Sequence, residues 1–193
     1  LILKSSNYAL YGDISRRMVA ILHDFSPEVE QYSIDEAYVH ITLPADQDYH
    51  DCGLNIRRTI LKWLGIPCGV GFAKTKTLAK IANHIGKKTS AGVFVMPDNP
   101  EKILSKTPVG EVWGVGRRLA PKLEQLGIRS AWQLACAEDS FLRRKFNVTL
   151  AITSRELRGE PLIEQDNPEE LSQSISCSRS YGYPVTEFSD LSE

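Results

Sequence analysis

The chain has 193 residues, of which 42% are hydrophobic and 24% charged, and its formal net charge is −1. These values are ordinary for a globular protein and leave room for one large or two small domains. No apolar run approaches membrane-spanning length and no segment has the character of a signal peptide, so we expect no membrane association. The four scattered cysteines lack C-x-x-C spacing, which argues against a zinc site and favours a reducing, cytoplasmic setting.

The first half of the chain alternates between helical and strand patterns. Apolar residues at three- and four-residue steps indicate helices, and period-two alternation or short apolar runs indicate strands. The patterns predict helices at about residues 8–25, 48–64 and 74–88, and strands at about 30–42, 66–72 and 92–96. This order predicts an α+β fold with a mixed or antiparallel sheet and helices on one face.

The second half of the chain has a different character. From Glu101 to about Arg158 the pattern is helical, in short pieces broken by glycine and proline, which predicts a small all-helical domain. An acidic, proline-containing linker follows, and weak alternation then resumes. We therefore expect four segments, with boundaries at 1–97, 98–160, 161–172 and 173–193.

Two adjacent carboxylates, Asp35 and Glu36, interrupt the predicted strands. In a continuous strand Asp35 would share an apolar row with Val39 and Ile41, where an unpaired carboxylate is costly. We therefore expect the ladder to bend or end near residues 34–36, which places both acids at the edge of a sheet. Such a pair is a candidate site for Mg²⁺, although adjacent acids in a turn are more often solvated surface.

The predicted helix at residues 74–88 carries five lysines and one histidine but no acid. A basic stretch of this kind indicates contact with a polyanion, and a solvated helix face is an equally good interpretation. Lys87, near the helix end, could favour the helix dipole or reach a triphosphate. The chain has no G-x-x-x-x-G-K-[ST] loop, which excludes P-loop chemistry.

A glycine-rich turn, Gly114–Val115–Gly116, is followed by Arg117 and Arg118 and by an amphipathic segment that closes at Leu126–Gly127–Ile128. This pattern is typical of a helix-hairpin-helix. Glycines there let backbone N–H groups approach a DNA phosphate, which positions a protein on DNA without reading bases. The alternative is an ordinary glycine turn between core helices.

Together these motifs resemble the Y-family translesion DNA polymerases, and further stretches resemble the UmuC branch of that family. The resemblance covers nearly the whole chain. It rests on Tyr32–Tyr38 (YSIDEAY), Gly69–Lys80 (GVGFAKTKTLAK), Val112–Arg118 (VWGVGRR), Arg155–Pro161 (RELRGEP) and Ile175–Gly182 (ISCSRSYG). It implies a palm over 1–97, a helical thumb over 98–160, and the start of a little-finger domain after the linker.

The resemblance also implies an activity and its residues. In this family two Mg²⁺ ions support transfer of a deoxynucleotide to a primer 3′ hydroxyl, in error-prone synthesis past damaged bases during the SOS response. By motif match, Asp35 would bind both metals, Glu36 the primer-side metal, and Lys87 the incoming triphosphate. The residues implied to contact primer–template DNA are Lys74, Lys76, Lys80, Gly114, Val115, Gly116, Arg117 and Arg118, although the three lysines could instead pack the helix on the sheet.

One expectation limits this interpretation. The family's first metal-binding carboxylate, its steric-gate aromatic and its fingers would precede Leu1, so we expect this fragment to be inactive alone and to bind metal weakly. A UmuD-type regulatory dimer, a recombinase filament and a sliding clamp are partners that the resemblance suggests for the full-length protein. The alternatives are a non-catalytic helix-hairpin-helix module that binds DNA, and a cyclase-like palm enzyme, which would not need a DNA-holding hairpin.

Overall fold

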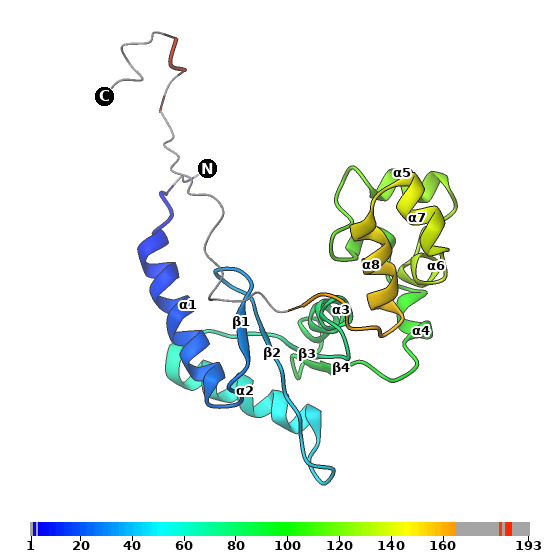
Figure 1. The fold of residues 1–193 in the computed structure, drawn as a ribbon. Coiled ribbons are helices and arrows are strands. Elements are labelled where there is room, and N and C mark those ends of the chain that lie inside the picture. The colour runs from blue at the N-terminus through cyan, green and yellow to red at the C-terminus, as the bar shows by residue number, and fades with distance from the viewer. Residues whose placement is uncertain (1, 3, 165–181, 183, 187–193) are drawn as a thin grey trace.

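The computed structural model describes residues 2, 4–164, 182 and 184–186. Most of the expected start of the little-finger domain, at residues 173–193, lies outside the described residues. Figure 1 shows the palm, with helices α1 and α2 and the β1–β2 hairpin, on one side of α3, and the thumb helices α4–α8 on the other. No helix in the described part of the chain is long and apolar enough to cross a membrane.

The described palm residues form three helices and four short strands. In chain order these are α1 (Tyr8–His23), β1 (Val29–Gln31), β2 (Ala37–Val39), α2 (Tyr49–Leu64), β3 (Val70–Phe72), α3 (Lys76–Gly86) and β4 (Val93–Val95). β1 and β2 pair antiparallel, and β3 and β4 pair parallel. The α+β class is as predicted, with the strands in two separate pairs rather than one continuous sheet.

Local signals explain where α2 begins and ends, and where α3 begins. The Asp48 carboxylate accepts a hydrogen bond from the His50 amide at the start of α2. Gly65 closes α2 with a φ of 70°, a left-handed conformation that glycine adopts without steric cost. At α3, the Thr75 hydroxyl accepts a hydrogen bond from the Leu78 amide.

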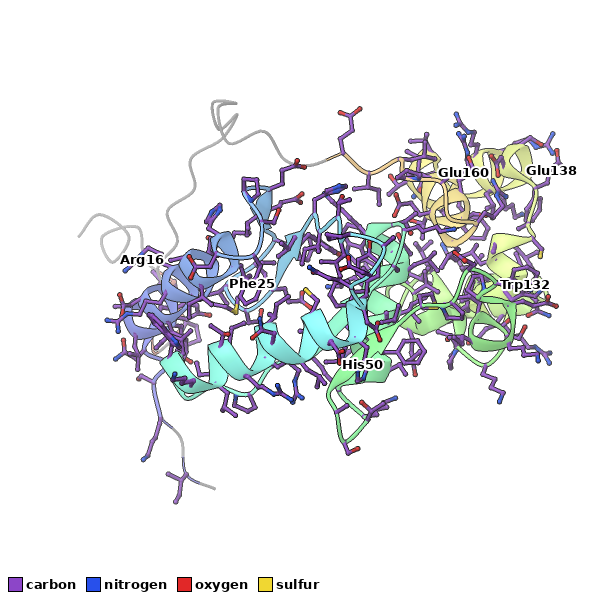
Figure 2. All side chains as sticks on the ribbon, turned by 90° about the horizontal axis from the view of Figure 1, so that it is seen from below. Arg16, Phe25, His50, Trp132, Glu138 and Glu160 are labelled. Carbon is purple, nitrogen blue, oxygen red and sulfur yellow. The ribbon has the colours of Figure 1, made fainter. Side chains whose placement is uncertain are left out.

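The thumb is built from short helices. They are α4 (Glu101–Leu104), the 3₁₀ turn η1 (Val109–Glu111), α5 (Ala120–Gln125), α6 (Ala131–Ala135), α7 (Asp139–Lys145) and α8 (Val148–Leu157). Their buried side chains form one cluster, which also includes Leu78, Ile81 and Ala82 of α3. The palm helix α3 is therefore part of the thumb core. Figure 2 shows Trp132, Glu138 and Glu160 at the thumb end of the molecule, away from Arg16 and Phe25.

A buried carboxylate joins the thumb to the palm. Glu156, on α8, is 1% exposed, and its Oε2 accepts a hydrogen bond from the Thr77 amide at the N-terminus of α3, at 3.0 Å. Its Oε1 accepts hydrogen bonds from the amides of Leu162 and Ile163, at 2.9 and 3.1 Å. These three backbone donors, one of them at a helix N-terminus, compensate the desolvation of this charge. The contact fixes α3 against the end of the thumb.

Candidate active site

The two acids lie in the turn between β1 and β2. Backbone amides of Tyr32 and Ser33 both donate to the Glu36 carbonyl oxygen at 3.0 Å, and β2 begins at Ala37. The prediction that the ladder ends before the acids is confirmed. Asp35 is exposed, and its Oδ1 accepts a hydrogen bond from the Ser33 hydroxyl at 2.8 Å. Asp35 therefore faces solvent, and its hydrogen bond with Ser33 fixes its carboxylate within the turn.

Glu36 faces helix α3. Its Oε2 lies 2.7 Å from the Lys80 ammonium nitrogen, in a half-buried ion pair. The same ammonium lies 4.8 Å from the centroid of the Tyr32 ring, within the range of a cation–π contact. Lys80 therefore neutralises Glu36 and contacts the aromatic residue that begins the turn.

A small cavity brings Glu36 together with Lys87, the residue matched to triphosphate contact. It has a volume of about 170 Å³, and Asp35 is not among its lining residues. The residues that line it are Glu36, Lys80, Asn83, His84, Lys87, Glu111 and Trp113. Sequence reasoning did not assign Asn83, His84, Glu111 or Trp113 to the site. The three- and four-residue steps from Lys80 to Lys87 could have found Asn83 and His84, because such steps share one face of a helix.

Gly69 makes room for Lys87. A Cβ atom on Gly69 would lie 2.6 Å from Cγ of Lys87, and the Asn83 side-chain amide donates to the Gly69 carbonyl at 2.9 Å. The Lys87 stem therefore crosses the chain just before β3, at a residue without a side chain. Lys87 is thereby placed among the residues that line the cavity with Glu36.

The other lysines predicted to contact DNA differ in their surroundings. Lys74 is exposed, with its ammonium 2.7 Å from Asp98. Lys76 is largely buried, with its ammonium 2.5 Å from Glu30 Oε2, 2.7 Å from the Glu164 carbonyl oxygen and 5.3 Å from the Tyr38 ring centroid. Of the two roles left open by the sequence, packing fits Lys76, because its charge is already compensated inside the protein.

Tyr38 adds a buried hydroxyl to this region. Its oxygen has no hydrogen-bond partner among the described residues. Burial raises the pKa of Tyr38 well above its usual range, and the neighbouring Tyr32 and Glu36 raise it further. The phenol is therefore neutral at physiological pH.

The predicted hairpin lies beside this cavity. Its first helix is only the single 3₁₀ turn η1, and its second is α5. Gly114 has a φ of 83° and requires glycine, whereas a Cβ on Gly116 would meet nothing within 4 Å. Val115 is 4% exposed, so its side chain belongs to the thumb core, while Arg117 and Arg118 are exposed. Open space at Gly116 and two exposed guanidinium groups suit the close approach of a large anion.

The fold is that of the palm and thumb domains of Y-family DNA polymerases. Residues 1–84 match the impB/mucB/samB family, and residues 97–128 match the IMS family HHH motif. The chain belongs to this family, the Y family of DNA polymerases.

The similar proteins are about twice as long as this chain. It is 45% identical to Protein UmuC of Salmonella typhimurium, over 97% of the chain and 46% of that protein. It is 33% identical to DNA polymerase IV 2 of Mycobacterium tuberculosis, over 76% of the chain and 42% of that protein. Among solved structures, DinB from Sulfolobus solfataricus superposes with a TM-score of 0.68 at 26% identity, covering 81% of this chain and 47% of that one. An insertion ternary complex of Dbh DNA polymerase gives 0.66 at 26% identity, covering 79% and 45%.

Proposed function

We propose that the protein containing this chain is an error-prone translesion DNA polymerase. It adds deoxynucleotides to a primer 3′ hydroxyl opposite damaged template bases, as part of the SOS response in the cytoplasm. The observation that supports this most directly is the cavity that Glu36 and Lys87 both line. It combines a carboxylate suited to bind a metal ion with a lysine suited to bind a triphosphate, and it lies beside a hairpin suited to bind DNA. The thiols of Cys52, Cys68 and Cys136 are free, which suits a reducing compartment.

The donor set of the turn fits Mg²⁺ in kind but is incomplete in number. Asp35 and Glu36 offer hard carboxylate oxygens, which Mg²⁺ prefers. The described residues contain no group of three acidic, histidine or cysteine side chains that could hold a metal. When bound, two Mg²⁺ ions would lower the pKa of the primer hydroxyl and neutralise charge on the triphosphate. Asp35 would contact both ions and Glu36 the primer-side ion.

The protein's own groups position the substrates. Lys87 binds the triphosphate, and its side chain packs where Gly69 has no Cβ atom. Lys80 orients the Glu36 carboxylate, which would hold the primer-side metal ion. Both roles are positional and electrostatic, which is the main protein contribution to phosphoryl transfer.

Primer–template DNA lies against the thumb hairpin. The backbone of Gly114, Val115 and Gly116 approaches a phosphate, and Arg117 and Arg118 add charge next to it. Lys74 contributes from the palm, whereas Lys76 is paired with Glu30 inside the protein and is assigned to packing. For the full-length protein, a UmuD-type dimer, a recombinase filament and a sliding clamp remain proposed partners.

The first test replaces one carboxylate in the full-length protein. We expect Glu36→Ala to reduce primer extension by at least about 10³-fold, because an essential metal ligand is removed, while circular dichroism and thermal melting change little. Glu124→Ala, an exposed glutamate on α5, is the matched control and should retain activity. Normal extension by Glu36→Ala would refute the site.

The second test separates DNA binding from catalysis in this chain. The double substitution Arg117→Ala/Arg118→Ala should weaken binding to a primer–template duplex. It should also lower the slope of log K against log salt by about two, because each arginine neutralises one phosphate. Lys102→Ala/Lys106→Ala removes equal charge elsewhere on the thumb and serves as control. An unchanged slope would show that Arg117 and Arg118 of the hairpin do not contact DNA phosphates.

A non-catalytic DNA-binding module is the second candidate, and one observation favours it for this chain alone. Lys80 already satisfies Glu36, and only two acids occupy the turn. The isolated chain should therefore bind duplex DNA without extending a primer. Template-dependent product from the isolated chain would contradict this expectation.

A further inference from the structure

Trp113 links the thumb to the turn that carries the acids. Its indole N–H donates to the Tyr32 hydroxyl at 2.9 Å, although the two residues are 81 positions apart. Its ring meets the Tyr32 ring edge-to-face, with centroids 5.4 Å apart, and lies 6.2 Å from the Tyr38 ring. Tyr32 and Tyr38 are themselves in edge contact at 5.7 Å. These three residues form an aromatic cluster between palm and thumb.

The thumb side of this cluster is firmly anchored. Val112 and Val115, which flank Trp113 and Gly114, are 3% and 4% exposed and belong to the thumb core. Trp113 itself is only half-buried, so filling the core does not account for its position. Between these two buried valines, Trp113 lines the same cavity as Glu36.

The palm side of the cluster leads directly to a site carboxylate. Tyr32 begins the turn, and its amide donates to the Glu36 carbonyl oxygen at 3.0 Å. Its ring faces the Lys80 ammonium at 4.8 Å, and that ammonium contacts Glu36 Oε2 at 2.7 Å. A displacement of the Tyr32 ring would therefore disturb both the backbone and the side-chain partner of Glu36.

We propose that Trp113 is a positioning residue that orients Glu36 through Tyr32 and Lys80. Trp113 immediately precedes Gly114, the left-handed residue of the hairpin, so a phosphate bound at the hairpin acts next to the indole. Occupation of the thumb by DNA is thereby coupled to the orientation of Glu36. This inference rests on the proposed function for the roles of Glu36 and the hairpin.

The chain of contacts is tested first in this protein without any activity assay. The three tryptophans, labelled as 5-fluorotryptophan, should give three ¹⁹F resonances, and Trp113→Phe identifies that of Trp113. Tyr32→Phe and Lys80→Met should both shift the Trp113 resonance. Lys74→Met removes a lysine that pairs with Asp98 instead, and it should leave the resonance in place. If either Tyr32→Phe or Lys80→Met left the ¹⁹F chemical shift of Trp113 unchanged, the inference would be wrong.

The functional consequence is tested by kinetics of the full-length protein. Trp113→Phe keeps an aromatic ring but removes the N–H donor, so we expect kcat to fall about fivefold, the equivalent of one neutral hydrogen bond. The Mg²⁺ concentration for half-maximal rate should rise, while the KM for DNA changes little. Tyr32→Phe should match it, and the double substitution should be no worse than either single one, because both remove the same bond.

The outcomes separate this inference from the proposed function. If Glu36→Ala abolishes extension while Trp113→Phe and Tyr32→Phe retain normal kcat and Mg²⁺ dependence, the polymerase assignment stands and the positioning role is wrong. If Glu36→Ala extends primers normally, the proposed function itself fails. Thermal melting of each variant shows whether a reduced rate reflects unfolding.

Discussion

The palm and the thumb are each stabilised by a different kind of internal contact. The thumb has a continuous apolar core in which five leucines are completely buried: Leu104, Leu123, Leu134, Leu142 and Leu157. In the palm, a separate buried cluster contains only Ile21, Leu22, Ile56 and Ile60 among the described residues, because the buried apolar residues of α3 belong to the thumb core. Polar links supplement this cluster, including the Glu30–Lys76 pair and the Arg57 guanidinium, which donates to the Cys68 carbonyl at 2.7 Å.

This difference matches the division of work proposed for the two regions. A well-packed apolar core fixes the hairpin backbone, which only has to present N–H groups at a constant position. Under the proposed function the palm turn would exchange partners, because Glu36 would hold a metal ion in place of its ion pair with Lys80. Polar contacts near the surface can be exchanged at lower cost than buried packing. The acids therefore lie where the structure is held by charge rather than by side-chain volume.

The sharpest test of the palm is removal of Lys76. Lys76→Ala leaves the Glu30 carboxylate, 8% exposed, without its cation, and we expect a decrease of about 4 kcal/mol in the free energy of unfolding. Urea denaturation measures this. The paired substitution Glu30→Leu/Lys76→Met removes both charges and should recover most of the stability. If Lys76→Ala were as stable as the unsubstituted chain but bound DNA more weakly, Lys76 would be a DNA contact after all.

The stability of the thumb should instead depend on the volume of its buried side chains. Leu134→Ala deletes a side chain with 0% exposure, and we expect a decrease of about 3 kcal/mol in the free energy of unfolding, from reduced burial and the cavity left behind. Leu126→Ala is the matched control, because Leu126 is 44% exposed and should cost less than about 0.5 kcal/mol. Added salt should leave the cost of Leu134→Ala unchanged. If this decrease in the free energy of unfolding depended on salt, the thumb would not differ from the palm in relying on apolar packing.

The sequence predicted those features of the fold that depend on neighbouring residues. The capping residues Asp48 and Gly65 set the limits of α2, and the conflict between Asp35 and its apolar row correctly indicated that the strand ends. The distribution of the lysines on α3 and just before it over different partners was not predictable. Lys74, Lys76 and Lys80 have similar local patterns, and their partners Asp98, Glu30 and Glu36 are fixed only when the chain folds.

The site was predictable to a similar extent. Motif matching brought Glu36 and Lys87 into one site, and the structure places both on the same cavity. Trp113 was interpreted only as part of the hairpin motif, because its contact with Tyr32 spans 81 positions. Long-range contacts of this kind depend on how α3 packs between palm and thumb. No periodicity in the sequence encodes them.

The smallest expected effect concerns the exposed ion pair between Lys74 of the palm and Asp98, just after β4. The hydrogen bond and charge of Lys74 hold the pKa of Asp98 below its usual range. Because that pKa is lower in the folded state, the pair adds stability above the unfolded pKa and loses it as pH falls through the folded pKa. Lys74→Ala should raise the pKa of Asp98, measured by carboxyl ¹³C NMR titration, while the urea midpoint at neutral pH hardly moves, because solvent screens the pair. Lys102→Ala, on α4, should leave the pKa of Asp98 unchanged. A large decrease in stability from Lys74→Ala would mean that exposed charge pairs, and not only the enclosed Glu30–Lys76 pair, contribute to the stability of the fold.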